Sequence, residues 1–349
     1  MMAAARPPIL LLGGSGSLGG KLARTLRRMH PQLPIAIAAR DAAKAGLLAK
    51  ELGNATVIQV DMGREDLGLP PDAVFSAVVA CLKDHGLNAM KYAQANRFAY
   101  VALSEAAFEI GPIVARYIHQ PASAPVLLLG HSIGSAPMLA SLHFAGEFRS
   151  IESVEIGLVF DPADTAGAMT VADMERIGAI ATAPLLLQDG RWVWQGGSTA
   201  QRRFASVDGI MREGAAVALV DTLGIANATG ARSVRLDIAE GRTASSLQGG
   251  PASHEVIIEI TGERKDGSAG RFRYELVDHA GYAAMSARGI ALAVERLLGF
   301  DGGAPAQAGL YLPEVLLAPE AMIRQLTAFD VRVSGPRSGH RSEQPIAAS

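Results

Sequence analysis

A glycine-rich turn between an expected strand and an expected helix constrains this chain more than any other feature. The apolar run 9–12 leads into Gly-Gly-Ser-Gly-Ser-Leu-Gly-Gly at 13–20, and an amphipathic stretch follows at 21–29. Glycines allow a tight turn and a close approach of backbone to phosphate, and the free N–H groups of a helix N-terminus attract an anion. We therefore predict a site for a dinucleotide pyrophosphate, formed by Gly13, Ser15, Gly16, Ser17, Leu18 and Gly19.

The spacing of these glycines is G-x-x-G-x-x-G and not the stricter G-x-G-x-x-G. In a chain with 38 glycines such a match is weak by itself, and the turn could serve only to close a βα unit. Its position favours the dinucleotide site, because the turn begins at Gly13, directly after an apolar strand, and opens an amphipathic helix.

The next expected strand, 33–39, ends at the position that usually contacts the adenosine ribose. An acidic residue there favours NAD, whereas a cation favours the 2′-phosphate of NADP. The chain has Arg40 followed by Asp41, and we expect Asp41 to be the N-cap of a helix over 42–52. This leaves Arg40, with Lys44 nearby, to meet a 2′-phosphate. NADP is therefore the predicted cofactor, with NAD possible; a solvated charge at the strand end is the alternative interpretation of Arg40.

A third strand is expected at 57–60, with Asp61 and Met62 at its end. In a doubly wound sheet this edge borders the adenine. We predict that Asp61 accepts a hydrogen bond from the adenine amino group and that Met62 packs on the ring. The alternative, in which Asp61 only caps the following turn, has equal support from the sequence.

The fourth strand, 73–80, is an almost continuous apolar run, which is typical of a parallel strand buried on both faces. It ends at Ala80, and Cys81 begins the loop that follows; we expect both to contact the cofactor, because ligands bind at the carboxyl edge of such a sheet. In the loop that follows, Lys83 could bind an anionic substrate and His85 could titrate near neutral pH. A polar surface loop is the alternative.

A second strand–turn–helix unit follows at 125–144. Its turn contains His131, which we expect at the same carboxyl edge, facing the nicotinamide or substrate; a histidine that only caps the helix is the competing interpretation. The turn Gly-His-Ser-Ile-Gly at 130–134 also matches G-x-S-x-G, so a serine hydrolase using Ser132 is a rival hypothesis. The N-terminal dinucleotide site counts against it, because a hydrolase does not need one.

After residue 150 the pattern changes from βα repeats to consecutive period-two strands. The sequence predicts an α/β fold in which a Rossmann doubly wound parallel sheet is joined to a second α+β domain with a mixed or antiparallel sheet. The expected divisions are a Rossmann domain at 1–150, a sheet domain for substrate or dimerisation at 151–282, C-terminal helices at about 283–330 that pack back on the first domain, and a disordered tail at 335–349.

Composition narrows the class of protein. A length of 349 residues suggests about two domains, and 49% hydrophobic with 19% charged residues is typical of a globular protein. A formal charge of −2 argues against a nucleic-acid partner. The single cysteine, Cys81, excludes an internal disulfide and a cysteine-based zinc site, so no metal is expected, and it fits the cytoplasm. No apolar run reaches the roughly 18 residues that span a bilayer, so no membrane partner is expected.

The chain resembles the saccharopine dehydrogenase-like (saccharopine reductase-type) superfamily of NAD(P)-dependent oxidoreductases. The resemblance covers nearly the whole chain. It rests on the glycine motif, on Ala-Ala-Arg-Asp at 38–41, on the strand at 99–105 and, most specifically, on Asp-His-Ala-Gly-Tyr at 278–282 and Gly-Leu-Tyr-Leu-Pro-Glu at 309–314. It implies a Rossmann domain, a sheet domain that covers the cofactor, and often a homodimer.

This resemblance also implies hydride transfer between NADP(H) and a small-molecule imine, carbonyl or enoyl compound. Such a reaction needs a proton donor and a group that orients the substrate. Our candidates are Lys83, His85, His131 and Tyr282, with His143 and His279 as weaker ones. A catalytically silent NAD(P)-binding sensor or assembly protein is the alternative.

Overall fold

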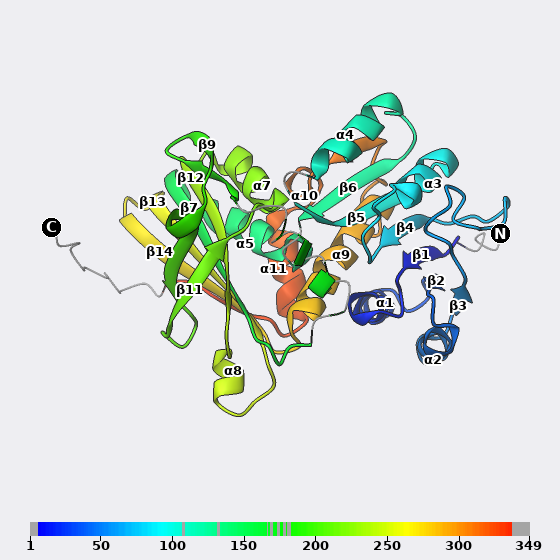
Figure 1. The fold of residues 1–349 in the computed structure, drawn as a ribbon, viewed down its shortest axis with the longest axis horizontal. Helices are drawn as coiled ribbons and strands as arrows, with labels where there is room; N and C mark the ends of the chain where they lie inside the picture. The colour runs from blue at the N-terminus through cyan, green and yellow to red at the C-terminus, as the bar shows by residue number, and fades with distance from the viewer. Residues whose placement is uncertain are drawn as a thin grey trace.

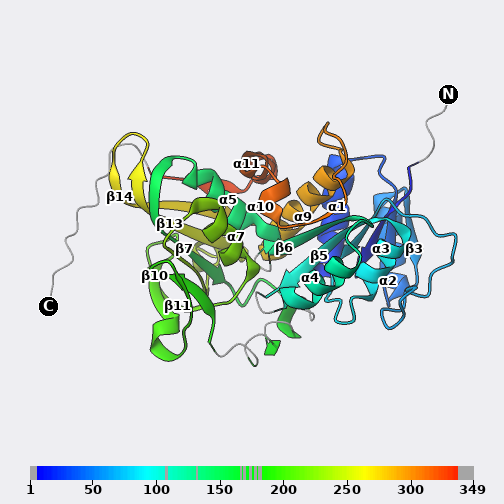
Figure 2. The same cartoon turned by 90° about the horizontal axis from the view of Figure 1, so that it is seen from above.

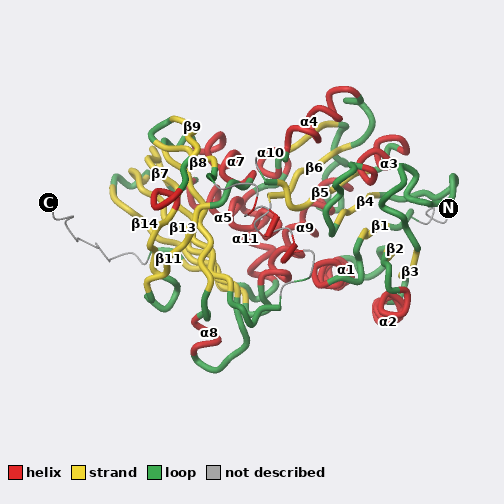
Figure 3. The backbone as a smooth tube through the Cα atoms, in the orientation of Figure 1, coloured by secondary structure: helices red, strands yellow, loops and turns green. Residues whose placement is uncertain are grey.

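Two β-sheets with helices between them form the architecture (Figure 1). The structure, a computed structural model, describes residues 6–106, 109–130, 133–165, 167, 170–172, 175, 176, 179 and 183–336. The strands gather into two separate groups, and helices lie between the groups (Figure 3). The blue and cyan part of Figure 1 carries the first sheet, and the green and yellow part carries most of the second.

The first sheet has seven parallel strands in the order β15-β6-β5-β4-β1-β2-β3. The order reverses between β1 and β4, which is the arrangement of doubly wound dinucleotide-binding sheets. The predicted Rossmann sheet is therefore confirmed. Its strands are β1 (Ile9–Leu12), β2 (Ile35–Ala38), β3 (Ala55–Ile58), β4 (Ala77–Ala80), β5 (Ala99–Glu105), β6 (Pro125–Gly130) and β15 (Gly309–Tyr311).

The two central strands are buried on both faces, as their apolar sequences predict. Leu12 pairs with Ala80, so β1 and β4 end at the same level, and their following loops start side by side. Helices cover the sheet because their apolar residues lie on one side, as Leu22 and Leu26 do in the first helix. These helices are α1 (Ser17–Met29), α2 (Ala42–Leu52), α3 (Asn88–Asn96) and α4 (Ile110–His119).

The C-terminal part of the chain returns to the first sheet. Strand β15 pairs with β6, and helix α9 (Tyr282–Leu298) packs along α1 (Figure 2). Helix α9 is the first of the C-terminal helices expected at about 283–330, whereas the sequence did not predict β15. Three residues with a partner almost 200 positions away carry no local pattern that would indicate a strand.

The second sheet is mixed, as predicted, with the order β10-β11-β12-β7-β13-β14-β16 and a hairpin, β8–β9, attached to β12. Only the β12–β7 pair is parallel among the pairs described. The strands are β7 (Phe148–Phe160), β8 (Leu185–Gln188), β9 (Arg191–Trp194), β10 (Gln201–Ala205), β11 (Met211–Ala216), β12 (Ser233–Glu240), β13 (His254–Arg264), β14 (Ala269–Asp278) and β16 (Arg332–Ser334).

One face of this sheet packs on helices and the other carries charges. On the helix side, Ile156, Ile258 and Leu276 are fully buried. The covering helices are α5 (Ala136–Ala145), α7 (Val220–Thr229), α9 and α11 (Pro319–Ala328), and the short elements are η1 (Ile133–Ser135), η2 (Gly197–Ala200), α8 (Ala244–Leu247) and α10 (Pro313–Leu316). Helix α7 was not predicted from the sequence, because its apolar and polar residues follow no amphipathic period.

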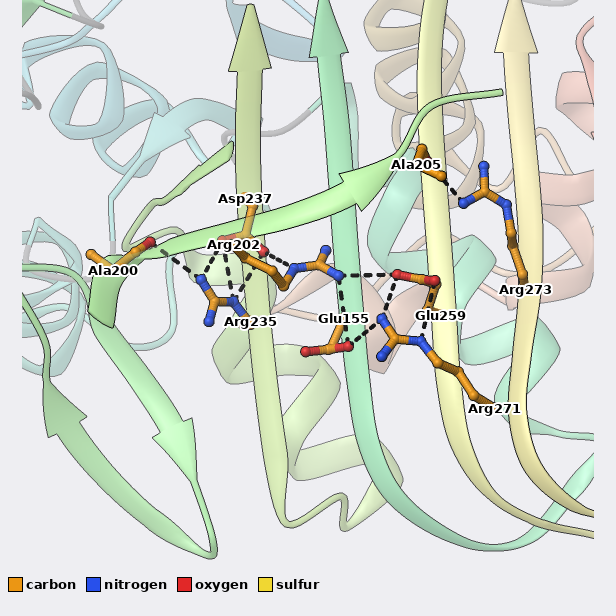
Figure 4. Close-up of polar contacts among 9 residues, drawn as sticks. All are labelled: Glu155, Ala200, Arg202, Ala205, Arg235, Asp237, Glu259, Arg271 and Arg273. Carbon is orange, nitrogen blue, oxygen red and sulfur yellow. Dashed lines mark hydrogen bonds and ion pairs between the residues drawn. The ribbon is translucent and has the colours of Figure 1, made fainter. Parts of the chain in front are cut away.

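On the opposite face, arginine and carboxylate side chains alternate across neighbouring strands (Figure 4). Arg202 lies between Asp237, at 2.7 Å, and Glu259, at 3.0 Å. Arg271 lies 2.7 Å from Glu155 and 2.6 Å from Glu259. Burial alone would raise the pKa of Glu259, but these arginines hold it below its usual value. Because each of these charges has an opposite neighbour, the sheet tolerates them in a partly buried layer.

Helix α9 crosses η1 with backbone against backbone. A Cβ atom on Gly289 would lie 2.1 Å from the carbonyl oxygen of Gly134, and one on Gly134 would lie 2.4 Å from the carbonyl oxygen of Ser286. No side chain fits in this crossing, which lies where the helix between the sheets meets the turn after β6.

We predict that Gly289→Ala destabilises the protein by about 1–3 kcal/mol, because the helix must move away from η1. Gly46→Ala is the matched control: Gly46 also lies in a helix, but nothing lies within 4 Å of an added Cβ. Its replacement should stabilise by about 0.5–1 kcal/mol. Urea unfolding monitored by circular dichroism measures both; effects of the same sign would contradict the proposed crossing.

Candidate functional site

The glycine turn holds α1 against the end of β1. A Cβ atom on Gly19 would lie 2.3 Å from the carbonyl oxygen of Gly13 and 2.7 Å from the Cα of Gly14. Only glycine lets the helix start this close to the strand. Gly16 is the N-cap of α1 and provides no side-chain cap, so the amide groups of the first turn are left to water or to a ligand.

The turn lies directly beside the loop after β4. The Cys81 backbone N–H donates to the Leu12 carbonyl at 2.9 Å. A Cβ atom on Gly13 would lie 3.2 Å from the Leu82 side chain and 3.4 Å from the Cys81 carbonyl oxygen. Ala80 and Cys81 thus flank the glycine turn at the point where the strand order reverses, which is where ligands of such sheets bind.

After β2, where we expect the adenosine ribose, Asp41 is the N-cap of α2 as predicted. Its carboxylate accepts from the Lys44 backbone N–H at 3.0 Å. Arg40 is exposed at the end of β2. Strand β3 ends at Ile58, two residues earlier than predicted, so Asp61 lies in the turn that follows. The Asp61 carboxylate accepts from the Gly63 backbone N–H at 2.8 Å, which is the turn-capping contact of the alternative interpretation.

Met62 lies beside Asp61 and contributes to the core at this edge. Its side chain is partly buried against the apolar cluster on one face of the first sheet. Its carbonyl oxygen accepts from the Asn88 side chain at 2.9 Å, which ties the turn after β3 to the start of α3.

Lys83 lies inside the loop after β4, whereas His85 is exposed. The Lys83 ammonium, 8% exposed, lies 2.9 Å from one carboxylate oxygen of Glu109, and Arg176 lies 2.5 Å from the other. The Ala106 backbone N–H also donates to Glu109, at 3.1 Å. Burial would raise the pKa of Glu109, but these donors, Lys83 first, hold it below its usual value. An ionised carboxylate therefore joins two cations at this edge.

Asp84 fixes the same loop, a role that our sequence analysis missed. Its carboxylate accepts from the backbone N–H groups of Asn88, Ala89 and Met90 at 2.9, 3.0 and 3.2 Å, and from the Tyr100 hydroxyl at 3.3 Å. Burial raises the pKa of Asp84, and the hydrogen bonds oppose that rise. An acidic residue just before a predicted helix is a capping pattern and could have identified it.

Tyr282 begins α9 and is 8% exposed. Its hydroxyl accepts from the Gly167 backbone N–H at 3.3 Å and donates to the Thr170 hydroxyl at 3.2 Å. Its ring lies 5.6 Å from that of Phe160 and 6.4 Å from that of His254. The structure thus places Tyr282 where the second sheet meets α1, the helix that follows the glycine turn.

The predictions for His131 and Ser132 fall outside the described residues, as does the expected tail from 337 onward. The adjoining turn has an unusual backbone: Ile133, Gly134 and Ser135 have φ of 62°, 59° and 65°. A left-handed conformation is costly for a β-branched residue such as Ile133. Such conformations occur mostly where function requires them, and this turn lies at the carboxyl edge of β6.

His254 is a buried residue that the sequence analysis did not single out. It starts β13, is 1% exposed, and its Nε2 atom has no hydrogen-bond partner. Burial lowers its pKa to about 3. In an unfolded chain the pKa is about 6.5, so below that pH the unfolded state takes up a proton that the native state refuses.

We therefore predict that the wild-type protein loses stability relative to His254→Phe as the pH falls from about 6.5 toward 3. The loss should reach about 2 kcal/mol at pH 5, because each pH unit contributes about 1.4 kcal/mol. Urea unfolding of both proteins at pH 7.5 and at pH 5 measures the difference. If the two proteins differ in unfolding free energy by the same amount at both pH values, native His254 takes up its proton as readily as the unfolded chain does.

Within the part of the chain that the structure describes, no group of three His, Cys, Asp or Glu side chains is arranged to hold a metal. No helix of that part is long and apolar enough to cross a membrane.

Comparisons with known proteins find structural similarity without sequence similarity. No family model and no curated protein matches the sequence. The apo saccharopine dehydrogenase (L-Glu forming) of Saccharomyces cerevisiae is 13% identical, with a TM-score of 0.62, over 95% of this chain and 99% of that chain. This similarity shows that the two proteins share a fold over almost their entire length.

Two further structures are more distant. An oxidoreductase from Agrobacterium radiobacter, solved with NAD+, L-tartaric acid and magnesium, is 11% identical with a TM-score of 0.49, over 93% of this chain and 94% of that one. An amine dehydrogenase from Mycobacterium smegmatis is 12% identical with a TM-score of 0.49, over 88% of this chain and 95% of that one.

Proposed function

We propose that this protein is an NADP(H)-dependent oxidoreductase that transfers a hydride to or from a small-molecule imine, carbonyl or enoyl compound. One observation carries the proposal. The first turn of α1 has no side-chain cap and starts beside the loop after β4, where the strand order reverses. The fold shared with a saccharopine dehydrogenase supports it, because the similarity extends over both sheets.

The residues present fit a dinucleotide. Glycines at 13, 16 and 19 let the start of the helix pack directly on the turn, because Cβ atoms at 16 and 19 would lie 3.1 and 2.3 Å from the Gly13 carbonyl oxygen. The amide groups there would hold the pyrophosphate, and the Cys81 loop would border the nicotinamide ribose. When bound, the cofactor supplies the hydride. The protein's own task is to orient the acceptor, exclude water and deliver a proton.

Lys83 is the best placed of the four candidates for that proton or for orienting the substrate. It lies at the carboxyl edge of β4, where its side chain is hydrogen-bonded to Glu109. In the reduction of a C=N or C=O group, Lys83 would give a proton to the nitrogen or oxygen of the acceptor. His85 is exposed beside the same loop. His131 stays a prediction.

Arg40 supports NADP over NAD. Asp41 is engaged as the N-cap of α2, so the exposed Arg40 is the residue at the end of β2 that can meet a ligand there. A guanidinium binds a phosphate through strong charge-assisted hydrogen bonds. We also propose that Asp61 and Met62, which lie in the turn after β3, contact the adenine.

We predict that Arg40→Ala weakens NADPH binding about tenfold or more and leaves NADH binding nearly unchanged, because a hydrogen bond to a charged group contributes about 1.5–3 kcal/mol. Fluorescence titration of both cofactors measures the ratio. Arg203→Ala removes the same charge from an exposed position on β10 and is the control. An unchanged NADPH-to-NADH ratio in Arg40→Ala would rule out the 2′-phosphate contact.

Activity itself is tested by following NADPH absorbance with a panel of imines, ketones and enoyl compounds. We expect oxidation with at least one acceptor, and a loss of at least tenfold in cofactor affinity in Gly19→Ala, whose Cβ would collide with the Gly13 carbonyl. Gly20→Ala is the control, because its Cβ would meet nothing closer than an Arg24 nitrogen at 3.4 Å. Tight NADPH binding with no acceptor ever reduced would favour the silent sensor instead.

One rival function, the oligomeric state and the cellular location complete this proposal. A serine hydrolase is the other alternative, and labelling of Ser132 by an active-site serine probe would support it. A homodimer is expected from the family resemblance, and a cytoplasmic location from the cysteine content. The homodimer and the location do not depend on the geometry of the glycine turn.

A further inference from the structure

The start of α1 and the start of α9 are joined directly. Ser17 and Lys21 lie four residues apart, so they share one face of α1. The Lys21 ammonium donates to the Ala280 carbonyl oxygen at 3.2 Å, just before α9 begins. The helix that would bind the pyrophosphate is therefore attached, within its second turn, to an element of the second half of the chain.

The segment after β7 packs on the start of α9. Asp164 accepts from the Tyr282 backbone N–H at 2.7 Å, which satisfies a free amide at the N-terminus of α9. Gly281 has φ of 85°, and a Cβ atom there would lie 2.6 Å from both Asp164 carboxylate oxygens. Asp164 can reach the helix only because this position is glycine.

The Tyr282 hydroxyl continues this set of contacts toward the glycine turn. It accepts from the Gly167 backbone N–H and donates its one proton to Thr170. A Cβ atom on Gly167 would lie 3.4 Å from the Ser17 Cβ, so Gly167 lies beside the first residue of α1. The start of α1 is thus flanked by Gly167, which the Tyr282 hydroxyl holds, and by Ala280, which Lys21 holds.

We propose that Tyr282 is a positioning residue for the cofactor pyrophosphate and not the proton donor, an inference that rests on the proposed function. Its hydroxyl holds Gly167 against Ser17, beside the helix N-terminus that the phosphates would approach. Its hydroxyl is engaged with the Thr170 hydroxyl and the Gly167 backbone N–H, and its ring lies beside those of Phe160 and His254. The second domain thus helps to shape the phosphate site through one hydroxyl.

The test is Tyr282→Phe in the full-length protein, which keeps the ring and removes only the hydroxyl. We expect the Kd for NADPH to rise about three- to tenfold, as loss of one or two neutral hydrogen bonds predicts. Binding of ADP-ribose 2′-phosphate, which carries the pyrophosphate, should weaken equally. Binding of adenosine 2′-monophosphate, which carries no phosphate at the 5′ position, should not change. At saturating NADPH, kcat and its pH profile should stay within about twofold of wild type.

Two variants accompany this test. Thr170→Val removes the other hydroxyl of the pair without touching α9 and should weaken NADPH in the same direction, which keeps the proposal testable if Tyr282→Phe folds poorly. Tyr117→Phe, which also loses one hydroxyl-to-backbone hydrogen bond, should leave the Kd unchanged.

The opposite outcome overturns the proposal: an unchanged NADPH Kd with a fall in kcat of a hundredfold or more and a lost limb of the pH profile would make Tyr282 the proton donor. Equal binding and equal kcat in Tyr282→Phe and wild type would also overturn it. If the wild-type protein binds neither NADPH nor NADH, the proposed function itself fails, and that result is distinct from both.

Discussion

The contact of α1 with the end of β1 is the interaction on which the rest of the structure depends. It requires Gly19, because the Gly13 carbonyl oxygen leaves no room for a Cβ atom. With this contact made, the uncapped first turn of α1 points to the edge where β1 and β4 end. A helix N-terminus can attract an anion through its backbone alone, without any basic side chain, and the proposed pyrophosphate site relies on this property.

Helix α9 carries this arrangement into the second half of the molecule. It lies beside α1 and crosses η1 at Gly134 and Gly289, so the turns after β1 and β6 both meet one rigid element. Its N-terminus is held by Asp164, from the segment that leaves the second sheet. Packed interiors transmit small displacements because they contain few voids. A displacement at the start of α9 would therefore reach both the glycine turn and the second sheet.

The sequence predicted the elements with a regular local pattern: the buried run of β4, the amphipathic α1 and the period-two strands after residue 150, such as β13 and β14. It missed α7, whose residues follow no amphipathic period, and β15, whose three residues gain their role from pairing with β6. For the candidate site, the chain order indicated Lys83 but not its partner. Glu109 lies 26 residues further on, and the pairing arises because β4 and β5 are neighbours in the sheet.

The sequence by itself determined the chemistry available: a glycine turn after a strand, an arginine before a helix cap, and a lysine after a buried strand. These are local features, decided by backbone sterics and by residues a few positions apart. The tertiary structure decided which polar groups are engaged. It gives the Tyr282 hydroxyl to Gly167 and Thr170, and leaves His254 buried without a partner at Nε2. Such pairings join segments more than a hundred residues apart, and no local pattern encodes them.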